Sequence, residues 1–420
     1  MSVLIEKPVI MTDFQKVRSQ TEKLCSPLEI EDYQIQPMAD ASPPKWHLAH
    51  VTWFFETFVL AKHSHNYQVF NPAYNYLFNS YYNGVGSPYP RVSRGHLSRP
   101  TVAEIYEYRK IIDERILNLL ETNPDPEIIF RVTLGLHHER QHQELMLTDV
   151  KYNFGNNPLL PSYNEKIDNN IGQVLPQKWI EFKGGIAEVG AFYSNDFIFD
   201  NETPRHKVFL APFYFSSHLV TNRDFLEFIQ NDGYERHDLW LSDGWAHLKS
   251  LGQNRWKYPL YWFEEDNVLF EYTLQGPRPL DLDAPLCHVS AYEADAFARW
   301  KGARLPTEQE WEFAASDLPV SGNFLSSGHF HPTRDDNESF SGLFGDVWEW
   351  TSSSYSPYPG FSPFEGSLGE YNGKFMSSQL VLRGGSCVSS QDHIRKTYRN
   401  FFYPRDRWQF SGIRLAKDSL

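Results

Sequence analysis

The sequence changes character near residues 156–178, and this change restricts the folds that the chain can adopt. Before it, apolar residues recur with helical spacing in four segments, namely residues 12–24, 45–62, 101–121 and 127–153. After it, short strand-like runs alternate with Gly and Pro. A chain of 420 residues is long enough to bury two cores. We therefore expect an α+β protein with a helical domain over residues 1–157, a linker over 158–177 and an irregular domain over 178–420.

Local signals mark where the helices begin. Pro43 and Pro44 introduce the second helical segment, since proline is favoured in the first turn of a helix. Thr101 and Glu104 form a capping-box pattern at the start of the third. Four helices make a bundle whose interior can hold ligands from facing helices. The intervening segment 63–100 is long for a loop, and its Tyr and Phe content favours an ordered, functional loop.

The second half offers fewer signals. Thr307 and Glu310 predict a capped helix, and residues 344–351, 381–386 and 410–416 have the composition of strands or turns. Taken alone, these features indicate only an irregular α+β domain.

Composition excludes several classes of partner. The formal net charge of −14 argues against binding nucleic acid or an anionic membrane surface. Three cysteines are too few and too scattered for a disulfide framework. We see no secretory leader and no apolar segment long enough to span a bilayer. We therefore expect a cytoplasmic protein.

Three histidines form the main candidate site. His138 and His142 are four residues apart in the longest helical segment, so both imidazoles face one side. The segment Trp46-His-Leu-Ala-His50, in another helix, offers a third imidazole. Three neutral imidazoles leave coordination positions open on a bound metal, and an open position indicates catalysis rather than a structural role.

Two alternatives stay open at this point. A histidine pair at this spacing is often only a solvated helix face. The residues His138-Glu139-x-x-His142 also spell the zinc metalloprotease signature, with Glu139 as the general base. No histidine follows His142 before His206, although Glu144 or Asp149 could complete such a site as a carboxylate ligand.

The two halves together resemble a known family. The N-terminal half resembles the DinB-like four-helix bundle, and the C-terminal half resembles the formylglycine-generating-enzyme (sulfatase-modifying) domain, whose fold is similar to C-type lectins. Their fusion, with Trp46-His-Leu-Ala-His50 and His138-Glu-Arg-Gln-His142, resembles the sulfoxide synthases of ergothioneine biosynthesis. The resemblance covers nearly the whole chain. It implies that the iron ligands are His50, His138 and His142. His47 lies three residues before His50, so helical spacing also allows it to face the metal, but we expect it to be a packing residue or to support a ligand.

The family's chemistry suits such a site. The resemblance implies that Fe(II) binds the thiolate of cysteine, the imidazole of hercynine (Nα-trimethylhistidine) and dioxygen in its three open positions. The family joins the sulfur to the imidazole C2 and oxidises it to the sulfoxide. These two events supply the four electrons that dioxygen takes up. The expected substrates are therefore hercynine, L-cysteine and O2.

The C-terminal pattern departs from one branch of the family. In that branch a Trp-Asp pair follows Arg-Asn, and a later Arg helps to bind γ-glutamylcysteine. Here Arg399-Asn400 is followed by Phe401 and Phe402, and Asp406 occupies the Arg position. A carboxylate cannot receive another carboxylate in the same way. The chain therefore resembles the subfamily that uses free cysteine.

That subfamily also carries a tyrosine pair in the long loop of the bundle. Tyr81 and Tyr82 match it, and we expect one of them to be the proton or hydrogen donor in catalysis. Consecutive residues on a loop have no fixed facing, so the sequence does not say which one. Tyr371, from the second half, is an alternative donor.

Other residues are candidates for binding the substrates. Arg91 and Arg94 follow the tyrosine pair and are suited to bidentate carboxylate binding, although surface ion pairs are an equally good interpretation. Gln141 lies three residues after His138 and shares its helix face. Phe401 and Phe402 are suited to shape the cavity or to contact the trimethylammonium group through cation–π interactions.

Three further possibilities follow from the resemblance. Formylglycine-generating chemistry would need a pair of copper-binding cysteines, and this region has only Cys387, so we reject it. The Gly345-Asp-Val-Trp-Glu349 segment matches a calcium-loop region of related domains, which makes Ca²⁺ a candidate ligand. The alternative functions are an ovothiol-type synthase, which generally carries an additional methyltransferase domain whereas this chain ends at Leu420, and a zinc-dependent hydrolase or thiol transferase.

Overall fold

A computed structural model describes residues 7–122, 125–164, 176–192, 197–334 and 340–419 and divides the chain into two compact units. Unit 1 comprises Met1–Leu159, Tyr193–Asp200 and Ser362–Gly373, and unit 2 comprises Leu160–Phe192, Asn201–Phe361 and Lys374–Leu420. The N-terminal part is helical and the rest is rich in strands, so the expected α+β class is confirmed. Residues 165–175 of the expected linker lie outside the described residues, and the expected domain boundaries stay a prediction.

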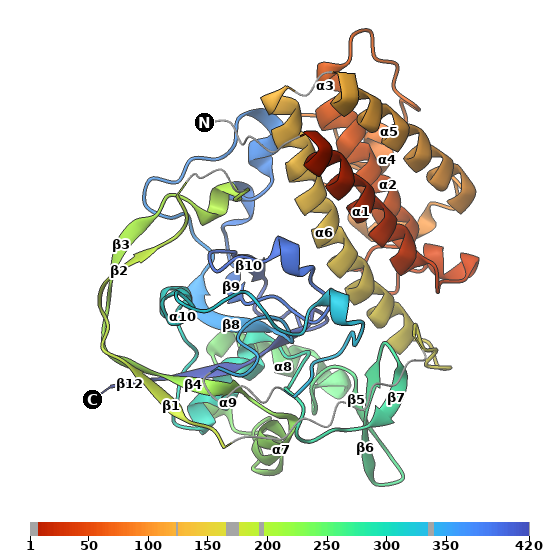
Figure 1. The fold of residues 1–420 in the computed structure, drawn as a ribbon. Helices are drawn as coiled ribbons and strands as arrows, with labels where there is room; N and C mark the ends of the chain where they lie inside the picture. Colours follow the sequence, from red (N-terminus) through yellow and green to blue (C-terminus); the bar gives the residue numbers. More distant parts are fainter. Residues whose placement is uncertain (1–6, 123–124, 165–175, 193–196, 335–339, 420) are drawn as a thin grey trace. The chain divides into compact units, whose positions relative to one another are not determined.

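Unit 1 is a bundle of four long helices. Figure 1 shows α1, α2, α5 and α6 packed side by side. The helices of this unit are α1 (Lys7–Cys25), α2 (Pro44–Phe55), α3 (Ala61–His63), α4 (Tyr74–Phe78), α5 (Val102–Thr122) and α6 (Pro126–Gly155). The four expected helical segments all appear. Pro126 occupies the first turn of α6, and the Asp125 carboxylate accepts the backbone N–H of Glu127 at 2.8 Å.

The second expected helix is not continuous. A π-helical turn, Glu56–Leu60, separates α2 from α3, where the sequence predicts one helix over residues 45–62. Such turns insert an extra residue per turn and are common near functional sites. All of α2 is buried, because it packs against both α5 and α6 and most of its residues are apolar. This burial places its histidines inside the bundle.

The long segment between α3 and α5 is ordered by short helices. Besides α4 it contains the 3₁₀ helix Arg91–His96, and the turn at Asn79 holds the loop in place. The Asn79 side chain accepts the N–H of Tyr82 at 2.9 Å and donates to the carbonyl oxygens of Tyr82 and Gly86. The expectation of an ordered loop here is confirmed.

In the described residues of unit 2, short strands form four small sheets. They are β1 (Trp179–Phe182), β4 (Phe213–Leu219) and β12 (Arg414–Asp418) in one; β10 (Asn400–Phe402), β9 (Leu380–Arg383), β8 (Trp348–Ser354) and β11 (Ser411–Gly412) in another; β2 (Gly185–Val189) with β3 (His206–Leu210); and β5 (Trp262–Glu265), β6 (Val268–Thr273) and β7 (Gly276–Pro279). The helices α7 (Asn222–Gln230), α8 (Ser242–Ser250), α9 (Ala291–Trp300) and α10 (Glu308–Ala314) complete the unit. The predicted capping box of Thr307 and Glu310 opens α10.

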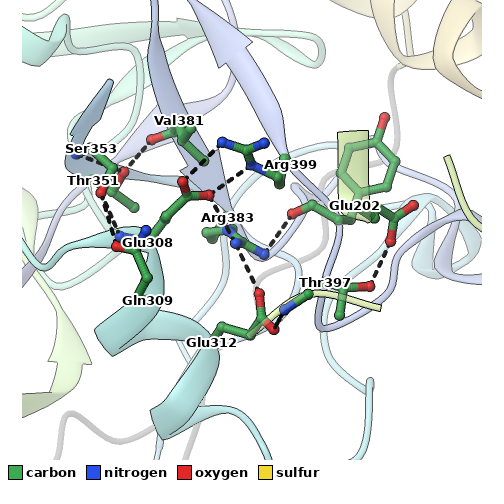
Figure 2. A network of polar contacts seen from close by, with 12 residues as sticks. Glu202, Glu308, Gln309, Glu312, Thr351, Ser353, Val381, Arg383, Thr397 and Arg399 are labelled. Carbon is green, nitrogen blue, oxygen red and sulfur yellow. Dashed lines mark hydrogen bonds and ion pairs between the residues drawn. The ribbon is translucent and has the colours of Figure 1, made fainter. Parts of the chain in front are cut away.

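A buried ion network joins α10 to the second sheet (Figure 2). Arg399 donates from Nε and Nη2 to the two oxygens of Glu308, at 2.8 and 2.9 Å. Arg383 donates from Nη2 to Glu308 and Glu312, both at 3.0 Å. Removing one member would leave another charge buried without compensation, so this network fixes β9 and the residues just before β10.

Within the described residues, no helix combines the length and apolar character needed to cross a membrane.

Candidate metal centre

Three histidines from two helices of unit 1 meet in the bundle interior. α2 carries His50, and α6 carries His138 and His142. One nitrogen from each ring lies within 4.8 Å of the others. The Nε2 atoms of His50 and His138 are 3.2 Å apart. The structure therefore brings together the three residues that helical spacing and family resemblance had predicted as metal ligands.

Helix geometry explains the convergence. His138 and His142 are one turn apart on α6, and their ring centroids are 4.6 Å apart. His50 faces them from α2, with its centroid 4.7 Å from that of His142. His50 and His138 are buried, whereas His142 is partly exposed. His142 is therefore the member of the group with solvent-accessible surface.

Aromatic rings hold His50 in one orientation. Trp46 stacks on His50 with centroids 4.6 Å apart and an interplanar angle of 11°, and Trp53 stacks at 5.6 Å. These residues lie four positions before and three positions after His50, so both rings share its helix face. The His50 Nδ1 is 2.6 Å from the Phe78 carbonyl oxygen, which can only accept. His50 therefore donates from Nδ1 and directs the lone pair of Nε2 toward the other histidines.

The electrostatics suit a cation. Burial lowers the pKa of His138 to about 3, and burial followed by the neighbouring imidazoles lowers the pKa values of His50 and His142. All three rings are therefore neutral near pH 7 and have lone pairs to offer. Neutral imidazoles suit zinc, copper, iron or nickel. The donor set fits a divalent transition metal with open positions.

Glu139 is not placed as a general base. Its carboxylate accepts from Arg18 Nη1 at 2.7 Å, Arg109 Nη2 at 2.6 Å and Thr21 Oγ1 at 2.6 Å, and none of its surface is exposed. Burial alone would raise its pKa, but Arg109 and Arg18 outweigh burial and lower it to about 2. A carboxylate held by two guanidinium groups has no free oxygen for a water nucleophile. This removes the main support for the metalloprotease interpretation.

Residues late in the chain reach the same site within unit 1. Tyr371 lies 5.7 Å from His138, ring centroid to ring centroid, and donates from its hydroxyl to the side-chain carbonyl of Gln141. Its ring also stacks on Phe199 at 5.3 Å. Asp200 accepts from Asn372 at 2.7 Å and thereby anchors the segment. Phe199 and Asp200 were not predicted, because nothing in the local sequence signals this long-range contact.

The predicted tyrosine pair lies on the loop after α4. The rings of Tyr81 and Tyr82 are 4.6 Å apart, and Tyr82 packs on Phe58 at 4.9 Å and on Trp53 at 5.8 Å. Burial raises the pKa values of both phenols, so both carry their protons near pH 7. The Glu370 carboxylate accepts the backbone N–H groups of Asn83 and Gly84, at 3.0 and 2.8 Å. The loop is thus fixed by the same late segment that carries Tyr371.

The two predicted arginines occupy different environments. Arg94 is 5% exposed, lies 3.4 Å from the Trp46 ring centroid, and donates to Ser42 Oγ at 2.9 Å. Within the described residues it forms no ion pair, and burial lowers its pKa. Arg91 is exposed and lies beside Asp40, with an N–O distance of 3.8 Å. This placement favours the surface ion pair that the sequence left open for Arg91.

The remaining predicted residues lie in unit 2. Phe401 stacks on Tyr355 at 4.1 Å, Phe402 meets Trp408 at 5.8 Å, and Asp406 accepts the N–H of Tyr403 at 3.1 Å. Their role in substrate binding stays a prediction.

The calcium prediction concerns Asp346 and Glu349. Asp346 accepts from Asn323 at 2.8 Å, and Glu349 pairs with Arg414 at 2.9 Å. A Ca²⁺ site at this segment also stays a prediction.

Comparisons with known proteins agree with both halves. Residues 170–338 and 326–419 match the Sulfatase-modifying factor enzyme 1-like domain, and residues 13–146 match the DinB superfamily. The hercynine oxygenase of Mycolicibacterium smegmatis is 28% identical over 99% of this chain and 100% of its own length. The hercynine oxygenase of Mycolicibacterium thermoresistibile is 29% identical over 96% of this chain and 93% of its own length. A formylglycine-generating enzyme of Streptomyces coelicolor is 29% identical over 57% of this chain and 89% of its own. The fusion expected from the sequence is confirmed: the chain belongs to the Sulfatase-modifying factor enzyme 1-like family, and it resembles hercynine oxygenases along nearly its whole length.

Proposed function

We propose that the protein is an iron(II)- and O2-dependent sulfoxide synthase that joins cysteine to hercynine in ergothioneine biosynthesis. The observation that carries the proposal is the group of three neutral imidazoles, His50, His138 and His142, within 4.8 Å of one another. Full-length similarity to hercynine oxygenases supports it. When bound, iron(II) would supply positions for both substrates and for dioxygen, and would favour the thiolate form of cysteine.

The residues around the triad suit two amino-acid substrates. Arg94 is a buried guanidinium without a carboxylate partner among the described residues, and such a group gains strongly from binding an anion. We assign it to the carboxylate of a substrate. Gln141 shares the face of His138 on α6 and offers an amide to a substrate imidazole or carboxylate. The stacked tryptophans and Phe54, 4.6 Å from His138, exclude water from the buried side.

The proton needed during sulfur–carbon bond formation would come from a phenol. Tyr81 and Tyr82 are our candidates, and Tyr371 is the alternative, since its ring contacts a ligand histidine. All three lie in unit 1: the rings of Tyr81 and Tyr82 are 4.6 Å apart, and Tyr371 is near enough to Tyr82 to contribute, after burial and Tyr81, to raising its pKa. These phenols can move a proton to the reacting centre without bulk water.

Free cysteine is the proposed thiol substrate. Phe401, Phe402 and Asp406 stand where one branch of the family has residues suited to γ-glutamylcysteine. Two apolar rings and a carboxylate offer no donor for a γ-glutamyl carboxylate. We therefore expect cysteine to have the higher kcat/KM when both thiols are compared at saturating hercynine and oxygen.

One experiment tests the function directly. The protein is purified anaerobically, loaded with iron(II) or zinc(II), and supplied with hercynine, cysteine and dioxygen. We expect the iron form to consume O2 and to form the sulfoxide-linked conjugate at the imidazole C2, which mass spectrometry and NMR identify. An iron form that consumes no oxygen, or a zinc form that hydrolyses peptides, contradicts the proposal. Conjugation of histidine at another ring carbon would indicate the ovothiol-type reaction instead.

A further inference from the structure

A second histidine of α2 joins one triad member to a buried carboxylate. His47 Nδ1 lies 2.8 Å from His142 Nδ1, and His47 Nε2 lies 3.0 Å from Asp149 Oδ2. His47 and Asp149 are each 3% exposed. The chain of contacts therefore runs inside the bundle from His142 through His47 to Asp149.

Helical spacing produces this chain from the same two helices that carry the triad. His47 lies three residues before His50 on α2, so both rings face α6. Asp149 lies seven residues after His142, which is two turns of α6 and returns to the same face. The packing of α2 on α6 that brings His50 to the triad also brings His47 between His142 and Asp149.

The direction of the hydrogen bonds follows from the acceptor at the far end. A carboxylate oxygen only accepts, and Asp149 Oδ2 also accepts the backbone N–H of Ser42 at 2.7 Å. His47 must therefore donate to it from Nε2, and the neutral form of the His47 ring then has its lone pair on Nδ1. That lone pair accepts from His142 Nδ1–H, so the free lone pair of His142 lies on Nε2. His142 is thereby held in the tautomer that presents Nε2 to a metal.

The three histidines of the triad differ in which group accepts a hydrogen bond from the ring nitrogen that faces away from the metal position. His50 donates from Nδ1 to the Phe78 carbonyl oxygen of the backbone. For His138, no partner of Nδ1 is found among the described residues. Among the described residues, His142 is therefore the triad member whose tautomer is set by side chains. Substitution of those side chains, His47 and Asp149, can test the effect. Metal-bound histidines generally donate their second ring N–H to such a partner, which orients the ring and strengthens the ligand.

We propose that Asp149, acting through His47, is a positioning residue that fixes the ligand tautomer and orientation of His142 and thereby sets the affinity of the triad for its metal. This inference rests on the proposed metal site. It also gives a role to Asp149, which the metalloprotease interpretation would have used as a direct ligand.

The test measures metal binding by the full chain without turnover. Cobalt(II) is titrated anaerobically into the apoprotein, and its visible absorption bands report both the dissociation constant and the ligand geometry. We expect Asp149→Asn and His47→Phe to weaken binding about 10- to 100-fold and to alter the bands, as loss of partners that support metal ligands generally does. The double variant should bind no more weakly than the weaker single variant, because both residues act along one path.

Two further variants separate positioning from general destabilisation. His47→Gln retains an acceptor and a donor in the side chain, so it should bind cobalt(II) more tightly than His47→Phe. Asp113→Asn removes another carboxylate inside the bundle, one that pairs with Arg18 at 2.7 Å, and should leave the cobalt(II) bands unchanged. If Asp149→Asn does not fold, the comparison of His47→Gln with His47→Phe decides the question.

The outcomes distinguish this inference from the proposed function. A wild-type protein that binds no cobalt(II), or a His142→Ala variant that binds as tightly as wild type, overturns the metal site itself. Tight wild-type binding, lost in His142→Ala but unchanged in Asp149→Asn and His47→Phe, overturns only the positioning role. A lower thermal stability of these two variants with unchanged cobalt(II) bands also counts against it.

Discussion

The carboxylate of Glu139 lies 2.6 Å from Nη2 of Arg109, although Glu139 directly follows the predicted ligand His138 in sequence. Consecutive residues on a helix point about 100° apart, so the two side chains serve different faces of α6. His138 faces α2 and the triad, whereas Glu139 faces the guanidinium groups of α1 and α5. The short motif that suggests a peptidase thus contains a predicted metal ligand and a structural anion.

We predict that Glu139→Gln destabilises the fold and spares the metal site. The substitution leaves Arg18 and Arg109 buried without a full counter-charge, which should lower the free energy of unfolding by about 3–5 kcal/mol. Denaturant unfolding of the apoprotein measures this loss. The matched control is Glu127→Gln on the same helix, where the exposed pair with Arg131 contributes less than about 1 kcal/mol. Unchanged stability together with loss of a zinc-dependent peptidase activity would restore the protease interpretation.

A second prediction concerns the thiol of Cys25. Burial raises its pKa from 9.0 to about 12. In the unfolded chain the thiol ionises near 9, whereas in the folded chain it stays neutral, so its contribution to stability is present below pH 9 and is lost as the pH rises toward 12. The thiolate is the reactive form, so iodoacetamide should label Cys25 at least about 100-fold more slowly in the folded protein than in urea. Peptide mapping by mass spectrometry gives both rates, and equal rates would contradict the burial.

Most of the bundle could be predicted from sequence, because its determinants are local. Proline at the start of α2 and the Thr101–Glu104 capping pattern mark helix starts, and Glu104 does accept the Thr101 N–H at 2.7 Å. The π-helical turn Glu56–Leu60 was missed, because one extra residue in a turn hardly alters apolar periodicity in a segment that is buried on all sides. The strands of unit 2 resisted prediction for another reason. β12 pairs with β4, far away in sequence, and no local pattern encodes such pairing.

The candidate site also has some residues whose positions local sequence predicts and others whose positions depend on the tertiary fold. The spacing of His138 and His142 is local, so helix geometry predicted their convergence. The position of Tyr371 against His138 depends on a segment that returns to unit 1 from late in the chain, and only the three-dimensional fold reveals it. Arg91 and Arg94 look equivalent in sequence, yet one is exposed and the other is buried on Trp46. Burial depends on tertiary packing, which spacing along the chain does not determine.

The contrast between these two arginines gives a third prediction. Arg94→Gln should raise the KM of an amino-acid substrate about 10- to 100-fold, since hydrogen bonds between charged groups contribute about 1.5–3 kcal/mol. Arg91→Gln should raise it less, because Arg91 already pairs with Asp40 at the surface. Steady-state kinetics with hercynine and cysteine varied in turn identify the affected substrate. A larger increase in KM for Arg91→Gln than for Arg94→Gln would show that Arg91 leaves Asp40 to bind the substrate.

A fourth prediction tests the loop that follows the tyrosine pair. A Cβ added at Gly84 would lie 2.6 Å from Ser367 Oγ, closer than such atoms approach. Gly84→Ala should therefore push against the Ser367 hydroxyl and the Glu370 carboxylate, at 2.6 and 3.1 Å, and lower kcat to the extent that rotation of these side chains does not relieve the contact. Ser367→Ala removes the clashing atom, so the double variant Gly84→Ala/Ser367→Ala should recover most of the lost activity. Failure of the double variant to recover would indicate that the close approach of these segments does not control catalysis.

The last prediction assigns the proton donor among the three tyrosines. The double variant Tyr81→Phe/Tyr82→Phe removes both phenols of the loop but keeps the rings that pack on Phe58 and Trp53. Without the donor, we expect oxygen to be transferred to the cysteine sulfur alone, so that the ratio of conjugate to cysteine sulfinic acid falls about 100-fold, within the range of general acid catalysis.

The variant Tyr371→Phe tests whether Tyr371, rather than Tyr81 or Tyr82, is the proton donor. It releases Gln141 from its hydrogen bond, so it should raise KM while conjugate stays the main product. Quantitative mass spectrometry of both products distinguishes the two effects. The reverse pattern, with sulfinic acid from Tyr371→Phe and an unchanged product ratio in the double variant, assigns the donor to Tyr371. That outcome would agree with its contact with His138, since a phenol beside a ligand ring needs no movement of the loop to reach the reacting atoms.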